Sequence, residues 1–303
     1  MSCPHPSTQI SRKEADERIQ LFLDNKMPIL SNCIEYKPEL SSVSYHPKGF
    51  QALLKKLDEV SYYDGVRIYF ATYLYNPFDS DGALHIPEHP TDPNDNCIDN
   101  MGLIFVPTTE AYKVVDGQRV KYHRDDIGSC WIIKGEQVVT LRSPATAPGR
   151  QQDTASNWIG YYQHLKLDKL SANGRILTAN DGFNDTKSIW YGKVDWGHRS
   201  DNKGLLDYVT CLIRDSNPLK EVIVKFAVYP FPNVTVDPIE DFRYQLTLIF
   251  HFKQADEPFQ GAGNTFFTFL KADRKKEGIL GDDTDTGNPC PPNTCDGSEL
   301  PQP

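Results

Sequence analysis

Residues 111–122 read AYKVVDGQRVKY and contain the clearest local fold signal in the sequence. Two runs rich in β-branched and aromatic residues flank the dipeptide Asp116-Gly117, which favours a two-residue turn. The pattern therefore predicts a β-hairpin with strands over 111–115 and 118–122. Just before it, residues 101–107 (MGLIFVP) are almost wholly apolar, which is typical of a short central strand.

Helix and strand patterns continue on both sides of this hairpin. Ser11 and Glu14 form a capping box before a helix over 11–27, and Pro47 opens a helix that ends before Asp64-Gly65. Further helices are expected over 154–170 and 202–215. Strands are expected over 66–75, 131–133, 137–141, 188–194, 221–229, 242–252 and 264–270.

The order of these elements indicates the fold class. Strands mostly follow strands in two blocks, with the helices before and between them, so we expect an α+β fold with largely antiparallel sheet and about four helices. Residues 1–280 can form one body. A division into sub-domains near 143–153 (SPATAPGRQQD) remains an alternative.

The charge of the chain is unevenly distributed. The sequence has 32 Lys and Arg against 41 Asp and Glu, a net charge of −9. Residues 281–303 contain five acidic residues, five prolines and no Lys or Arg, which predicts a disordered tail. The alternative is a peptide that is pinned to the body, or to a neighbouring copy, through Cys290 and Cys295. An acidic chain is a poor candidate for binding nucleic acid by phosphate neutralisation.

Cysteine usage and hydropathy bear on the compartment. Seven cysteines in 303 residues do not resemble a small disulfide framework, and the first 16 residues lack the apolar stretch of a secretory signal. We therefore expect free thiols and a cytoplasmic protein. No apolar run reaches the length that spans a bilayer, so no membrane partner is expected.

A long polar segment over 76–100 contains groups that can bind a metal ion. These groups are His85, His89, Asp92 and Cys97. They raise the alternative of a metal-assisted hydrolase, although prolines at 87 and 90 prevent the two histidines from sharing a helix face. The competing interpretation is a solvated loop, because Asx and Pro clusters favour turns.

A second enzymatic alternative depends on Cys130. Gly128-Ser-Cys-Trp131 resembles the active-site string of papain-like cysteine proteases, which implies a nucleophilic thiol with a downstream histidine such as His251. The family's helix after the cysteine is replaced here by a strand pattern, so a buried thiol is the default expectation. His123-Arg-Asp-Asp126 resembles a kinase catalytic loop, but the other kinase motifs are missing from the sequence.

Three large aromatic residues gather at 190–196. Trp190, Tyr191 and Trp196 lie among Asn and Asp residues, a composition that suits a sugar or a peptide partner if the rings are exposed. They predict a carbohydrate-binding module in that case. The competing interpretation is that the rings fill the core, because large aromatic residues are mostly buried.

Several segments together resemble an uncharacterised family of bacterial proteins. They are the capped N-terminal helix, the strand GVRIYF at 65–70, the strand LIFVP at 103–107 and the Cys-Pro-Pro-x-x-Cys tail at 290–295. The family has no assigned activity, so the resemblance implies a bacterial origin and no catalytic residue. It also implies that the tail is part of the protein's design.

The leading functional hypothesis is a non-enzymatic protein that binds a protein partner or assembles with itself. The sequence contains no complete catalytic motif, no cofactor is expected, and many Tyr and Phe residues are available for contacts.

Overall fold

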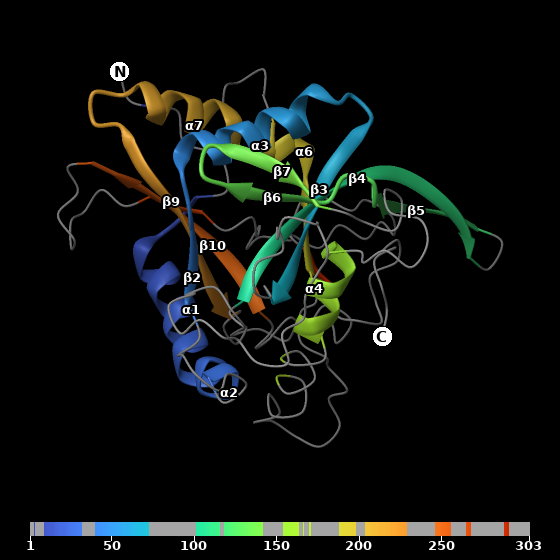
Figure 1. Cartoon of the computed structure of the whole chain (residues 1–303), viewed down its shortest axis with the longest axis horizontal. Coiled ribbons are helices and arrows are strands. Elements are labelled where there is room, and N and C mark those ends of the chain that lie inside the picture. The colour runs from blue at the N-terminus through green and yellow to red at the C-terminus, as the bar shows by residue number, and fades with distance from the viewer. Residues whose placement is uncertain are drawn as a thin grey trace, which may run out of the picture.

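The computed structural model describes residues 3, 9–31, 40–72, 101–115, 118–141, 154–163, 166, 170, 188–197, 204–228, 246–255, 265–267 and 288–290. Within these ranges the strands form two sheets, and helices cover their outer faces and one end (Figure 1). Every pairing between the described strands is antiparallel. The expected α+β class with largely antiparallel sheet is therefore confirmed.

The first sheet has the strand order β1-β11-β10-β9-β2 in the described part of the chain. Its strands are β1 (Gln9–Ile10), β2 (Ser42–Tyr45), β9 (Leu219–Val228), β10 (Leu246–Gln254) and β11 (Thr265–Phe267). Helix α1 (Arg12–Asn25), followed by α2 (Met27–Ser31), packs on its outer face, where Ala15 contacts Ala227 and Ile249.

The second sheet has the order β12-β8-β3-β4-β6-β7, and β5 pairs with β4 outside this path. Its strands are β3 (Tyr63–Thr72), β4 (Met101–Val115), β5 (Gln118–Asp125), β6 (Trp131–Lys134), β7 (Gln137–Thr140), β8 (Ser188–Gly192) and β12 (Asn288–Cys290). Helix α4 (Thr154–Tyr162) covers its outer face through Trp158 and Ile159.

A shared hydrophobic core lies between the two sheets. Phe70 of β3 packs against Phe226 of β9, and Tyr191 of β8 packs against Phe250 of β10. Successive residues of a strand point to opposite faces. Val66, Ile68 and Phe70 therefore join this core, while Tyr69 and Ala71 contact the outer cluster with α4. The core includes residues from both sides of the segment 143–153.

Three helices close one end of the two sheets. They are α3 (Pro47–Glu59), α6 (Lys193–Trp196) and α7 (Leu205–Arg214). Gln51 of α3 donates to the hydroxyl of Thr210 of α7 at 2.9 Å. The ammonium of Lys193 donates to the carbonyls of Asp58 and Val60 at 2.8 Å each, which satisfies acceptors at the end of α3.

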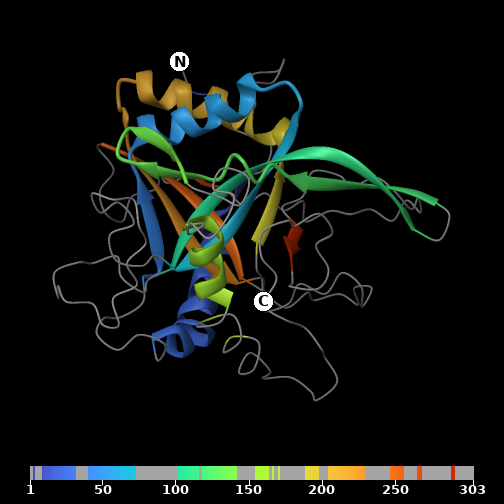
Figure 2. The ribbon, with the colours of Figure 1, turned by 45° about the vertical axis from the view of Figure 1, so that its right-hand side comes forward.

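A two-stranded hairpin extends from the second sheet and is called the arm below. It consists of residues 109–115 of β4 and 118–124 of β5 (Figures 1 and 2). β3 accompanies β4 only as far as Thr109, so residues 110–115 pair with β5 alone among the described strands. The predicted hairpin is confirmed, because Val115 lies opposite Gln118.

Several predicted boundaries are wrong, and those around β3 and β4 bear on the site. The strands expected at 101–107 and 111–115 are one strand, because Pro107 pairs opposite Val66 and its carbonyl accepts from the amide of Asp126 at 2.8 Å. Proline lacks the backbone N–H that donates to a neighbouring strand but keeps its carbonyl acceptor, so the strand continues through Pro107. Asp64-Gly65 belongs to β3, and helix α3 ends earlier, at Glu59.

Candidate functional site at the root of the arm

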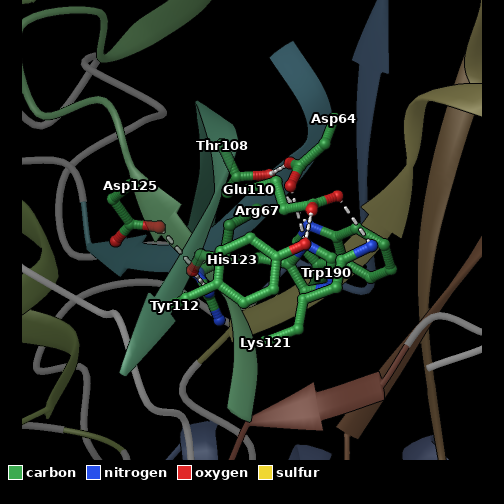
Figure 3. Close-up of polar contacts among 9 residues, drawn as sticks. All are labelled: Asp64, Arg67, Thr108, Glu110, Tyr112, Lys121, His123, Asp125 and Trp190. Atoms are coloured by element: carbon green, nitrogen blue, oxygen red, sulfur yellow. Dashed lines mark hydrogen bonds and ion pairs between the residues drawn. The ribbon is translucent and has the colours of Figure 1, made fainter. Parts of the chain in front are cut away.

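A polar cluster joins the root of the arm to the outer face of the second sheet (Figure 3). The strand registers bring it together: Thr108 lies opposite Asp125, and Arg67 lies opposite Trp190. β3, β4, β5 and β8 therefore each contribute side chains that are distant in sequence.

His123 of β5 is fixed from two sides. Its Nδ1 lies 2.8 Å from a carboxylate oxygen of Asp64, and its ring stacks on the indole of Trp190 with the centroids 3.8 Å apart. The hydroxyl of Thr108 donates to Asp64 at 2.5 Å and accepts from the indole N–H of Trp190 at 2.9 Å. Because an ionised carboxylate only accepts, Nδ1 carries the hydrogen of the His123 contact.

A buried ion pair lies next to this group. Arg67 Nε donates to Asp125 at 2.7 Å, and the two side chains are 3% and 0% exposed. Arg67 also donates to the carbonyl of His123 at 2.8 Å, and the phenol of Tyr69 donates to Asp125. Burial opposes the charge of Arg67, but its interactions with Asp125, Tyr69 and Asp64 together outweigh burial and raise the pKa of the guanidinium.

The chemistry of the cluster favours a structural role over proton transfer. The second ring nitrogen of His123, Nε2, is buried and has no hydrogen-bond partner among the described residues. A general base must reach its substrate within hydrogen-bond distance, and a buried nitrogen does not offer that access. The cluster instead fixes the root of the arm to the body through two acidic groups on different strands.

Beyond the root, the arm carries an exposed row of side chains on the same face as His123. Lys121 binds Glu110 at 2.8 Å, and the phenol of Tyr112 donates to the same carboxylate. The guanidinium of Arg119 lies 3.8 Å from the centroid of the Tyr112 ring. Val114 follows towards the tip and is 74% exposed.

Glu110, Tyr112 and Lys121 shift the pKa values of one another. Hydrogen bonds from Lys121 and Tyr112 lower the pKa of Glu110, and the hydrogen bond to Glu110 raises the pKa of Lys121. The hydrogen bond to Glu110 likewise raises the pKa of Tyr112. All three groups therefore hold their ordinary neutral-pH charge states more firmly.

The predicted aromatic binding residues are buried. Trp190, Tyr191 and Trp196 are 5%, 2% and 0% exposed. Tyr191 stacks on Trp196 at 5.3 Å, and both contact Phe250 of the opposite sheet. A carbohydrate-binding module needs exposed rings to contact the sugar. These three rings are instead buried in the core and at the root of the arm.

Cys130 lies beside the second sheet, whereas His251 lies on the first. Cys130 precedes β6, is buried in the outer cluster under α4, and its thiol donates to the carbonyl of Ile127 at 3.6 Å. His251 lies on β10 opposite Ile223 and is also buried. The strand after Cys130 replaces the helix N-terminus that lowers a thiol pKa in such proteases.

The metal-binding prediction concerns residues outside the described ranges. His85, His89, Asp92 and Cys97 lie there, as does Cys295. Within the described residues, no group of three or more His, Cys, Asp or Glu side chains could hold a metal ion. Cys290 is in β12, whose backbone pairs with β8.

The expectation of free thiols is wrong for two cysteines. Cys3 and Cys211 form a disulfide that links the start of the chain to α7 across 208 residues. Their proximity results from the tertiary fold, which cysteine counting does not reveal.

The sequence analysis did not identify Asp64, Arg67 or Thr108 as site residues, and it included His123 and Asp125 only in a kinase-like string. One signal was present: Arg67 interrupts the apolar strand GVRIYF, and a buried charge in a strand requires a partner. Identifying that partner required the register of β4 with β5.

Comparisons with protein-family models, with curated proteins and with solved structures find no match for this chain. In the described part of the chain, no helix is both long enough and apolar enough to cross a membrane.

Proposed function

We propose that this chain is a non-enzymatic interaction protein that contacts a protein partner, or further copies of itself, through the arm. The observation that carries the proposal is a projecting two-stranded ribbon with exposed Val114 and Tyr112, which are 74% and 47% exposed. Beyond Thr109, neither outer edge of the ribbon pairs with another described strand. Such edges recruit strands or peptides from other chains.

The anchoring at the root supports this role. An isolated two-stranded hairpin is marginally stable in water. Here the buried Arg67–Asp125 pair and the Asp64–His123 contact fix its base. A fixed base reduces the ordering cost that a contact element would otherwise incur on binding.

The enzymatic alternatives remain predictions. A metal-assisted hydrolase would depend on residues 76–100, which lie outside the described ranges, and no described contact favours a thiol mechanism at Cys130. The arm is therefore the better-supported candidate.

A charge at the exposed tip of the arm tests the proposal. Val114→Glu places a carboxylate directly opposite Arg119, so the hairpin itself is retained. Tyr62→Glu is the matched control, because Tyr62 is 66% exposed but lies on the body before β3. The readouts are light scattering over a concentration series and affinity purification from the native source.

We expect the wild type to form oligomers or to retain partner proteins, and we expect V114E to weaken this association about tenfold or more, as for a contact residue at the centre of an interface. Y62E should behave as the wild type. A wild type that is monomeric and recovers no partner contradicts the proposal, as does equal association of wild type and V114E.

A further inference from the structure

The backbone of the arm alternates between residues that bond within the hairpin and residues that do not. The amide of Asp126 donates to the carbonyl of Pro107, which lies directly opposite when the register of β5 with β4 is continued by one pair. Hydrogen-bonded and non-hydrogen-bonded pairs alternate along an antiparallel ladder. Glu110, Tyr112 and Val114 therefore belong to non-bonded pairs, and their N–H and C=O groups point away from β5.

These three residues form an open strand edge, which is called the β4 edge below. β3 pairs with the same side of β4 nearer the root, but this pairing ends at Thr109. Beyond it, no described strand bonds to the three N–H and three C=O groups of the β4 edge. An exposed edge of this kind can accept an added strand through main-chain hydrogen bonds.

The opposite edge of the arm, on β5, is partly occupied. Its outward-pointing residues are Arg119, Lys121 and His123, because they lie opposite the three residues of the β4 edge. The carbonyl of His123 already accepts from Arg67 at 2.8 Å. The β4 edge therefore has more backbone groups without a described partner.

Positive charge from β5 lies over the β4 edge. The guanidinium of Arg119 reaches across the arm to within 3.8 Å of the centroid of the Tyr112 ring. Lys121 also reaches β4, where it binds Glu110 (Figure 3). The charge of Lys121 is thus matched by a carboxylate, whereas Arg119 pairs with no carboxylate among the described residues. A strand added to the β4 edge lies about 4.8 Å from Tyr112, so an acidic side chain there can meet the guanidinium.

The β4 edge is poorly suited to a second copy of itself. An antiparallel pairing that uses all three residues places Tyr112 opposite its counterpart and residue 115 of the second copy opposite Thr109, where Tyr63 of β3 already lies. Shifting the second arm outward by two residues places Lys113 opposite its own counterpart. Like charges directly opposite each other are destabilising, so the edge favours a different chain.

We propose that the β4 edge binds an extended, acidic segment of another polypeptide chain, which adds to the arm as a third strand with a carboxylate opposite Tyr112. This inference rests on the proposed function, because it names the partner chemistry of the same arm. The backbone of the β4 edge holds the segment, and Arg119 binds its carboxylate. The next residue of the segment on this face lies opposite Val114, where a β-branched side chain packs well.

Two seven-residue peptides test the proposal, acetylated and amidated DTVEVTD and its variant DTVQVTD. Hydrogen exchange of the nitrogen-15-labelled full chain measures each amide separately. In the free protein, the amides of Tyr112 and Val114 should exchange faster than that of Lys113, which belongs to a bonded pair. Millimolar DTVEVTD should slow their exchange by at least about twofold, the effect of half-occupancy, and should leave Arg119 and Lys121 unchanged.

The same titration measures the role of the charge. DTVEVTD should bind about two- to fivefold more tightly than DTVQVTD, which is the contribution of one exposed ion pair. Arg119→Gln should abolish this difference between the peptides. Lys220→Gln is the matched control, because it removes an exposed basic side chain of β9 in the other sheet and should retain the difference.

Three results overturn the proposal: neither peptide protects the β4 edge, the protected amides are those of the β5 edge, or the wild type binds both peptides equally. Protection of the β4 edge on concentrating the protein alone also contradicts it, because the occupant is then a second copy. A contact through side chains alone would weaken in V114E without protecting any amide, so this proposal can fail while the proposed function stands. Equal association of the wild type and V114E, with the amides protected by DTVEVTD, would contradict the proposed function alone.

Discussion

The ion pair between Arg67 and Asp125 is almost completely buried, with side chains that are 3% and 0% exposed. Removing one charge of a buried pair leaves the other uncompensated, which costs about 3–5 kcal/mol. We therefore expect Asp125→Asn to lower the free energy of unfolding by that amount, measured by urea denaturation.

The matched control is Glu221→Gln, which removes the carboxylate of the partly exposed Glu221–Lys253 pair at 3.5 Å. Its two side chains are about one-third exposed, so water and salt screen the pair, and a loss of about 0–1 kcal/mol is expected. Similar small losses in both variants would show that the buried pair does not hold the root of the arm.

At the same scale, the titration of Glu110 reports whether its contacts with Lys121 and Tyr112 on the arm are formed. Its pKa is lowered from 4.5 by Lys121 and Tyr112, so the contribution of its charge is present above pH 4.5 and is lost as the pH falls through the lowered value. The pKa of Lys121 is raised from 10.5. The stabilisation that the lysine charge contributes is therefore lost only as the pH rises above 10.5 through the raised pKa.

Carbon-13 NMR of the Glu110 carboxyl measures this directly. Lys121→Met should move the midpoint up towards 4.5, because it removes the hydrogen bond that contributes most to the lowered pKa. Lys113→Met, which changes the opposite face of the arm, should leave the midpoint near its wild-type value. An unchanged midpoint in K121M would contradict the contact.

At the scale of elements, helix α3 approaches the β6–β7 hairpin at Gly49. A Cβ at this position would lie 2.2 Å from the carbonyl oxygen of Gly135, a residue with φ of +59° at the hairpin turn. Backbone cannot yield as a flexible side chain does, so Gly49→Ala must push α3 away from the hairpin. We expect a loss of about 1–3 kcal/mol, in the range of overpacked sites.

Gly160→Ala in α4 is the opposite case among the described glycines. A Cβ there meets no atom within 4 Å, and glycine within a helix is destabilising relative to alanine. The free energy of unfolding of this variant should rise by about 0.5–1 kcal/mol. Urea denaturation measures both glycine variants. A lower free energy of unfolding for Gly49→Ala, together with a higher one for Gly160→Ala, would support the close approach of α3 to the β6–β7 hairpin. A gain in both would contradict it.

At this scale, helices and strands could be predicted wherever residues adjacent in the sequence carry a cap, a turn or a hydrophobic pattern. Ser11 caps α1 by accepting from the amide of Glu14 at 3.2 Å, and the turn composition at 116–117 marks the hairpin. The continuity of 101–107 with 111–115 was not predicted, because proline is depleted in strands and Pro107 nevertheless lies within β4. Strand β12, with a proline at its centre and acidic residues around it, carried no strand signal.

At the scale of the whole molecule, the site could not be predicted because its contacts join distant segments. Asp64 and His123 are 59 residues apart, and Trp190 and Thr108 are 82 residues apart. Only the sheet order β8-β3-β4 with β5 brings them together. Without related sequences or a matching structure, no pattern in a single chain reveals such pairings.

The disulfide between Cys3 and Cys211 is the longest-range of these pairings, and it predicts a redox-dependent stability. Closing a loop of 208 residues restricts the unfolded chain, which typically stabilises a protein by about 2–4 kcal/mol. For a chain of 303 residues, that corresponds to a fall of about 3–6 °C in Tm when the bond is reduced.

Thermal unfolding with and without dithiothreitol measures this effect. The wild type should lose stability on reduction, whereas C3S/C211S should unfold at the temperature of the reduced wild type and should not respond to the reductant. C290S/C295S is the matched control, because it removes two cysteines outside this bond and should keep the wild-type response. A wild type that is insensitive to dithiothreitol while its bond is reduced, as verified by mass, would show that the link between the chain start and α7 contributes nothing to stability.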